Sequence, residues 1–322
     1  MRSSRGLLLF VFISGLVVVS ACQQVSISKD ARARSRDQQA RTSSSETYGP
    51  PVKLADLQDK AIDESSGLVA SRTSPGSYWT HNDSGNGPFI YAFDAKGQRK
   101  GVWQVTGATS DDWEDMAAGP GPKANTNYLY IGDIGDNSNE RSEIIVWRIP
   151  EPVIPSTDNG STEKKPEVTE AAEAIRFRYP DGKHNSETLL VHPTNGRIYV
   201  LVKVPIVNPG VYAADMPANT SQVITFKRIG EIDMPGLAGG ILTGGDISPD
   251  GLRVALCDYI QGYEIVLNDP KASFESIWTQ PLQTVDLGKR KHGEAVTYRL
   301  DGRALLATSE RLPAPLIEIV RK

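Results

Sequence analysis

An acidic residue followed by small or apolar residues recurs five times along the chain, and this repeat is the feature that most constrains the fold. After each acid come a turn signal, a short apolar run and a second strand-like run, and four of the copies continue into a candidate outer strand. Four strands per repeat, repeated five times, predict an all-β fold, a β-propeller with five blades. The repeat acids are Glu64, Glu114, Glu187, Asp246 and Glu294.

The fifth copy ends at Lys322 without an outer strand. Residues 52–57 precede the first copy, and we expect them to supply that strand and so close the ring. The alternative is a helix, because residues 54, 57, 61 and 62 are apolar at helical spacing. Residues 152–169 are interpreted as an insertion between the third and fourth strands of the second blade. If they hid another blade, the propeller would have six.

The amino terminus is typical of a targeting segment. Arg2 and Arg5 precede an apolar stretch at residues 7–19 that is too short to span a bilayer. The stretch ends in Val-Ser-Ala-Cys at residues 19–22, which resembles the bacterial lipoprotein signal, although an ordinary secretory signal is the alternative. We therefore predict a signal peptide at 1–21, a lipid on Cys22, a flexible tether at 22–48 and the propeller at 49–322. The predicted location is the cell envelope outside the cytoplasm, in the outer membrane if the cell has one.

Charge and cysteine content exclude several classes of protein. The formal net charge is -4, and the tether holds an excess of basic residues, so the propeller segment is more acidic than the whole chain. This composition argues against a nucleic-acid binder. The two cysteines cannot form a disulfide scaffold or a Cys-based zinc module. Cys257 lies in an apolar run and is predicted to be a buried, inert thiol.

Propeller geometry places many charged residues on one face. The loops that enter each first strand and those that leave each second strand open at the same end of the channel, so we expect the repeat acids to form a ring there. Two carboxylates 4 Å apart repel by about 4 kcal/mol at an effective dielectric constant of about 20, so a full ring needs a cation, bound protons or the ammonium group of Lys203. Oxygen ligands favour Ca²⁺, and a solvated acidic rim is the alternative. The same face is predicted to hold Asp83, Asp133, Lys203, Asp258, Glu310, Asp112, His81, His184 and His292.

Two loops in adjacent blades, residues 81–87 and 132–139, are rich in Asp, Asn and Gly. They are either tight turns or extra carboxylates beside the ring. The sequence lacks the Gly-x-Ser-x-Gly, P-loop and His-Glu-x-x-His motifs, so serine-hydrolase, P-loop and zincin chemistry are not predicted.

Four segments together resemble a group of poorly characterised secreted bacterial propeller proteins. They are residues 64–68, 79–85, 112–115 and 132–137. More distantly, the acidic starts are similar to those of esterase-like phytase propellers, and the plan is similar to that of calcium-activated nucleotidases. The resemblance implies a propeller with calcium in its channel, but it transfers no substrate, because the phosphate-binding bases of those enzymes have no clear matches here.

Two functions remain open from the sequence. The first is a lipid-anchored binding or scaffold protein with a structural calcium, whose partners are the membrane and a small anionic ligand or an envelope protein. The second is a metal-dependent hydrolase, a phosphoesterase or less plausibly a glycosidase, in which the repeat acids hold the metal and Asp112 or His292 is the general base. The residues expected to bind a ligand are His81, Asp83, Asp133, Asp136, Arg141 and Lys203.

Overall fold

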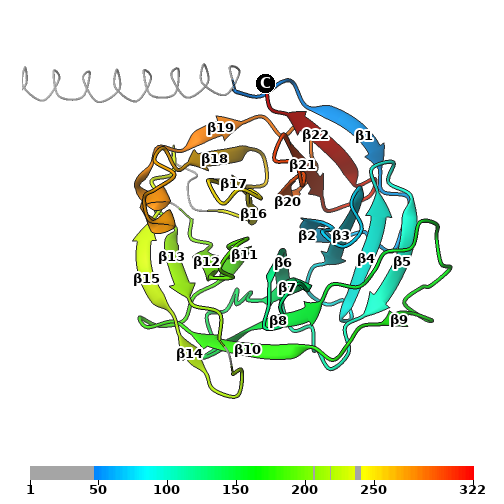
Figure 1. Cartoon of the computed structure of the whole chain (residues 1–322), viewed down its shortest axis with the longest axis horizontal. Helices are drawn as coiled ribbons and strands as arrows, with labels where there is room; N and C mark the ends of the chain where they lie inside the picture. The colour runs from blue at the N-terminus through cyan, green and yellow to red at the C-terminus, as the bar shows by residue number, and fades with distance from the viewer. Residues whose placement is uncertain (1–46, 206, 218, 236–240) are drawn as a thin grey trace, which may run out of the picture. The chain divides into compact units, whose positions relative to one another are not determined.

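A computed structural model describes residues 47–205, 207–217, 219–235 and 241–322. Five small sheets surround a central channel, and the inner strands β2, β6, β11, β16 and β20 face it (Figure 1). The prediction of a five-bladed β-propeller is therefore confirmed. The predicted signal peptide, Cys22 and nearly all of the tether lie outside the described residues.

Each blade is an antiparallel sheet that runs from the channel to the rim. Blade 1 consists of β2 (Ser65–Ala70), β3 (Ser77–Asn82), β4 (Phe89–Asp94) and β5 (Arg99–Gln104). Blade 2 consists of β6 (Trp113–Pro120), β7 (Asn127–Asp133), β8 (Ile144–Pro150) and β10 (Glu173–Arg178). Blade 3 consists of β11 (Ser186–Val191), β12 (Ile198–Val202), β13 (Gly210–Ala214) and β15 (Lys227–Glu231).

Blade 4 consists of β16 (Gly244–Ile247), β17 (Arg253–Cys257), β18 (Gly262–Val266) and β19 (Gln283–Val285). A 3₁₀ helix, η1 (Phe274–Thr279), lies between β18 and β19. Blade 5 consists of β20 (Gly293–Tyr298), β21 (Ala304–Ser309), β22 (Pro315–Val320) and β1 (Val52–Asp56). No helix in the described ranges is both long and apolar enough to cross a membrane.

The hydrophobic core lies between neighbouring blades. One cluster joins blades 2 and 3 through Tyr130, Phe177 and Val200, all fully buried. Alternating strand residues on the two faces of each blade contribute to two such clusters, which explains why whole inner strands are buried. Two of the hairpin turns contain a glycine with a positive φ, a backbone conformation that other residues rarely adopt: Gly196 (φ 70°) and Gly251 (φ 72°).

The ring closes through the amino-terminal strand. Strand β1 pairs antiparallel with β22, with Val52 opposite Glu318 and Asp56 opposite Pro315. The closure prediction is confirmed and the helix alternative is wrong. Leu57 and Ile62 follow the strand and are buried, which accounts for the apolar spacing that suggested a helix.

The segment at residues 152–169 is an insertion, as predicted, and does not form a sixth blade. Within it β9 (Glu167–Val168) pairs in parallel with β5 and extends the edge of blade 1. In the same way β14 (Ile224–Thr225), from blade 3, pairs with β10 of blade 2. Covering exposed strand edges in this manner protects them from pairing with other chains.

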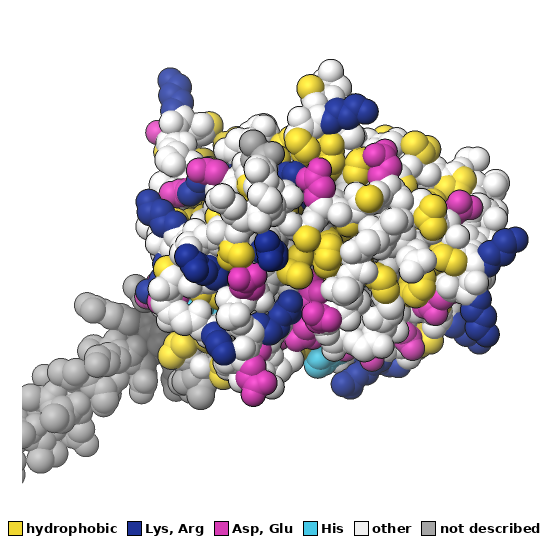
Figure 2. Space-filling view, turned by 90° about the horizontal axis from the view of Figure 1, so that it is seen from below, with side chains coloured by type: hydrophobic (Ala, Val, Ile, Leu, Met, Phe, Trp, Pro, Cys, Tyr) yellow, Lys and Arg dark blue, Asp and Glu magenta, His cyan; other side chains and the backbone are white. Residues whose placement is uncertain are grey.

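The side of the ring seen in Figure 2 has a mixed surface. Lys and Arg side chains are interspersed there with Asp and Glu, and apolar side chains are scattered among them (Figure 2). This face of the described chain shows no continuous basic surface of the kind that binds nucleic acid.

Candidate metal-binding site at the mouth of the channel

Three repeat acids occupy the same structural position in their blades. Glu114, Glu187 and Glu294 are each the second residue of an inner strand, at the point where the pairing with the next strand shifts register. Such a bulge changes the direction of a side chain and increases the local twist. All three side chains are buried at one end of the channel, with residue exposures of 5%, 4% and 5%.

The other two repeat acids do not join this group, so the expected ring of five is incomplete. Glu64 directly precedes the inner strand β2. Its side chain is exposed to solvent and accepts a hydrogen bond from Asn86 Nδ2 at 2.8 Å. Asp246 lies further along its strand, because β16 and β17 pair without a register shift. Its carboxylate accepts hydrogen bonds from Thr297 Oγ1 and from the Tyr298 amide, both at 2.8 Å.

A first acidic cluster consists of Asp83, Asp112 and Glu114. One carboxylate oxygen of each lies within 4.8 Å of the others. Gly135 makes room for it, since a Cβ atom there would lie 2.3 Å from Asp112 Oδ2 and from Glu114 Oε1. Burial and the repulsion of nearby acids, Glu187 first, hold the pKa of Glu114 well above its usual range, and burial also raises the pKa of Asp83 and of Asp112. These groups are too close to carry full charge together without a cation.

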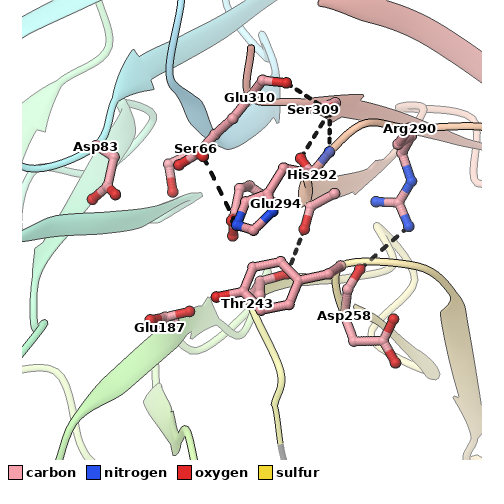
Figure 3. Close-up of polar contacts among 12 residues, drawn as sticks. Ser66, Asp83, Glu187, Thr243, Asp258, Arg290, His292, Glu294, Ser309 and Glu310 are labelled. Atoms are coloured by element: carbon pink, nitrogen blue, oxygen red, sulfur yellow. Dashed lines mark hydrogen bonds and ion pairs between the residues drawn. The ribbon is translucent and has the colours of Figure 1, made fainter. Parts of the chain in front are cut away.

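A second cluster brings His292 together with two acids. His292 Nε2 lies 3.2 Å from Glu294 Oε1 and 3.9 Å from Glu310 Oε2, and the imidazole lies between the two carboxylates (Figure 3). Burial, Glu187 and Glu310 raise the pKa of Glu294 to about 10. Burial, Arg311 and Lys203 lower the pKa of His292, so its imidazole is neutral near pH 7.

Lys203 supplies a positive charge between the two clusters. Its Nζ forms an ion pair with the Glu187 carboxylate and donates a hydrogen bond to the Tyr259 hydroxyl at 2.6 Å. Burial lowers the pKa of Lys203, but the attraction of Glu187 outweighs burial and the net pKa is raised. The ammonium group of Lys203 is therefore paired within the protein, and its role in binding an anion stays a prediction.

Three of the predicted ligand-binding residues, Asp133, Asp136 and Arg141, make contacts that organise a loop. Asp133 accepts hydrogen bonds from the amides of Asp111 and Asp112, and its Oδ1 pairs with Arg141 at 2.8 Å. Asp136 accepts hydrogen bonds from the Glu140 and Arg141 amides, at 2.8 and 2.9 Å. These contacts use the carboxylates to fix the backbone that carries Asp112 and Gly135.

His81 is part of the core. It is fully buried, its Nδ1 contacts the Asn82 carbonyl oxygen at 2.8 Å, and its ring packs edge-on against Trp113. Burial lowers the pKa of His81 to about 4, so the imidazole stays neutral. His184 lies outside both clusters and pairs with Asp181 at 3.0 Å, while Asp258 accepts a hydrogen bond from the Tyr263 hydroxyl.

Asp115 was not predicted as a special residue, yet it links three blades. Its Oδ2 accepts hydrogen bonds from the Leu189 and Gly245 amides, at 3.0 and 3.2 Å, and its Oδ1 accepts from the Met116 amide. The sequence signal was a second acid directly after a repeat acid, which occurs only in the second copy. Cys257 is fully buried, as predicted, and burial raises the pKa of its thiol.

The fold and the mouth together define the class of protein: a five-bladed β-propeller with groups of acidic residues that could bind a metal ion. The sequence matches no model of a known protein family and no curated protein. The resemblance to secreted bacterial propellers therefore remains a prediction that rests on the motifs themselves.

We expect the metal-free protein to lose stability as the pH rises from about 5 to about 9. The pKa of Glu294 is raised to about 10 and that of Glu310 to about 7 by burial and neighbouring acids, whereas an unfolded glutamate titrates near about 4.3. The folded state therefore binds more protons over this range, and the free energy of unfolding falls as they are lost. Thermal midpoints measured in chelator across this range test the expectation. Glu294→Gln should flatten the decline, and a midpoint that rose with pH would contradict it.

Proposed function

We propose that this protein is a lipid-anchored, calcium-binding propeller of the cell envelope that acts as a binding or scaffold protein. The observation that carries the proposal is the state of Glu114. Its residue exposure is 5%, no described residue donates a hydrogen bond to its carboxylate, and it lies within 4.8 Å of two further carboxylates. A carboxylate in such surroundings takes up a proton unless a cation compensates its charge, and a metal ion that displaces the proton would do so.

The chemistry of the first cluster favours Ca²⁺. All three side-chain donors are carboxylate oxygens, and Ca²⁺ accepts six to eight oxygen ligands in flexible geometry, including water. Asp83 and Asp112 come from loops and Glu114 from a strand, so the three need not adopt the strict octahedron that Mg²⁺ demands.

The surroundings of the cluster favour binding over hydrolysis of a phosphoester. Arg141 and Lys203, the cations expected to hold an anionic substrate, both pair with carboxylates. Asp112, one of the two predicted general bases, would be a metal ligand itself. A metal-dependent hydrolase remains the second candidate, because the neutral imidazole of His292 faces the mouth and could accept a proton from water.

Calorimetric titration of the purified full-length chain tests calcium binding. We expect one Ca²⁺ to bind, and Asp112→Asn to weaken binding by roughly tenfold or more, because it removes a ligand charge. Asp269→Asn is the matched control, since it removes an exposed carboxylate outside both clusters and should leave binding unchanged. If wild type and Asp112→Asn bound Ca²⁺ equally well, the site assignment would be wrong.

Anchoring through Cys22 is tested separately. In cells fed a labelled fatty acid, the wild-type chain should incorporate label and fractionate with membranes, because acyl chains provide stable attachment. Cys22→Ser should lose both properties, whereas Cys257→Ser should retain them. Unchanged labelling of Cys22→Ser would show that the lipoprotein motif had been misread.

A further inference from the structure

We propose that His292, Glu294 and Glu310 form a second metal site, which binds a transition ion such as Zn²⁺ and shares no ligand with the calcium site. One nitrogen and two carboxylate oxygens converge here, all within 4.8 Å of one another. The proposal extends beyond calcium binding and does not depend on it.

The distances suit a small ion. Zn²⁺ binds nitrogen and oxygen at about 2.0–2.2 Å, so ligand atoms around a tetrahedral ion lie about 3.3 Å apart. His292 Nε2 is already 3.2 Å from Glu294 Oε1 and 3.9 Å from Glu310 Oε2. Closure around an ion therefore needs only a small rotation of the Glu310 side chain, which lies on a loop after β21.

Glu294 provides an independent indication that a cation belongs here. Its residue exposure is 5%, and no residue in the described ranges donates a hydrogen bond to its carboxylate. Its one ion-pair contact there is His292, which is charged only if protonated. A metal ion bound between Glu294 Oε1 and His292 Nε2, which already lie 3.2 Å apart, would compensate the charge of this buried carboxylate.

The backbone holds the ligands in place before any ion binds. The His292 amide donates to Ser309 Oγ at 2.9 Å, and the His292 carbonyl accepts from Ser309 Oγ and from the Glu310 amide, at 2.8 and 3.0 Å. From the neighbouring blade, Thr243 Oγ1 donates to the Gly293 carbonyl at 3.0 Å. Fixed ligands lower the cost of assembling a site.

The ring of Tyr259 also helps to hold the imidazole of His292 in place. Tyr259 packs against the imidazole of His292 with ring centroids 4.0 Å apart and the ring planes tilted by 31°, and its hydroxyl accepts the hydrogen bond from Lys203. The donor set distinguishes this site from the first cluster. Imidazole nitrogen suits Zn²⁺ and similar ions, whereas Ca²⁺ prefers oxygen alone. Three protein ligands leave a fourth position for water or a ligand group.

Titration of the full-length chain with Co²⁺ tests the site, because Co²⁺ absorbs visible light and occupies zinc sites. We expect one equivalent to bind with the spectrum of a four- or five-coordinate ion, and Zn²⁺ to displace it. A spectrum without a thiolate charge-transfer band would exclude binding by Cys22 or Cys257. His292→Asn should weaken Co²⁺ binding by roughly tenfold or more.

His184→Asn is the matched control. His184 also lies beside an acid, Asp181 at 3.0 Å, but it lies outside both metal-type clusters, so its loss should not change Co²⁺ binding. Circular dichroism confirms that each variant is folded, and Glu310→Gln provides a second test on a partly exposed side chain.

Two results would overturn the proposal. One is wild-type Co²⁺ affinity in both His292→Asn and Glu310→Gln, and the other is loss of binding in His184→Asn. The calcium proposal is tested independently of this one. Asp112→Asn should weaken the calcium response and leave Co²⁺ binding intact, so an absence of calcium binding would leave the test of this second site unaffected.

Discussion

A chain that lacks residues 23–57 should fail to form a stable propeller, whereas a chain that lacks only residues 23–46 should be as stable as the full chain. The longer deletion removes β1, which is the outer strand of blade 5, and it removes Leu57 from the core. It also leaves the edge of β22 unpaired. Urea unfolding followed by circular dichroism measures the difference.

The closing segment is also held by a buried carboxylate. Glu264 is fully buried and accepts hydrogen bonds from the Tyr48 hydroxyl at 2.6 Å, from the Tyr298 hydroxyl at 2.8 Å and from Arg321 at 2.9 Å. Breaking a buried ion pair costs about 3–5 kcal/mol, because an uncompensated charge remains. The longer deletion leaves the ion pair between Arg321 and Glu264 in place but removes the hydrogen bond from Tyr48, which adds to the cost of the unpaired edge.

Point variants separate these two contributions. Glu264→Ala should reduce the free energy of unfolding by about 3–5 kcal/mol, and Tyr48→Phe, which removes one hydrogen bond, by about 1–2 kcal/mol. Equal stability of the two truncated chains would show that the ring does not depend on closure by β1.

Calcium should raise the thermal midpoint of the protein by about 5–10 °C. A ligand at 100 times its dissociation constant stabilises the folded state by about 2.7 kcal/mol, and for a domain of this size each kcal/mol shifts the midpoint by about 2–4 °C. Chelator should reverse the shift, and Mg²⁺ should reproduce it poorly because it requires tighter octahedral geometry. Scanning calorimetry with each ion makes the measurement.

Glu114→Gln should change the metal-free and calcium-bound proteins in opposite directions. It keeps the shape of the side chain but removes a negative charge that burial and Glu187 make unfavourable. The metal-free midpoint should therefore stay level or rise, while the calcium response weakens. Asp269→Asn is the control and should alter neither. A lower metal-free midpoint with no calcium response in the wild type would mean that the acids serve the structure alone.

The architecture of the propeller could be predicted from the amino-acid sequence alone. The spacing of Glu114, Glu187 and Glu294 within their repeats places each at the same bulge of an inner strand, so a local pattern was enough to predict that they lie at the same end of the channel. Closure by residues 52–57 and the insertion at residues 152–169 followed from counting strands. These features depend on hydrophobic periodicity and turn signals, which act over a few residues.

The pairing of the charged groups, in contrast, could not be predicted and follows from the folded structure. Nothing in the local sequence of Lys203 indicates that its ammonium group contacts Glu187 and Tyr259. The local sequence of Arg141 likewise does not indicate its ion pair with Asp133. Asp246 belongs to the same repeat as the other acids, but the regular pairing of β16 and β17 directs it toward β20 instead. Electrostatic pairing depends on distances of a few ångströms between blades that are far apart in sequence, and those distances are fixed by bulges, burial and blade packing rather than by repeat spacing.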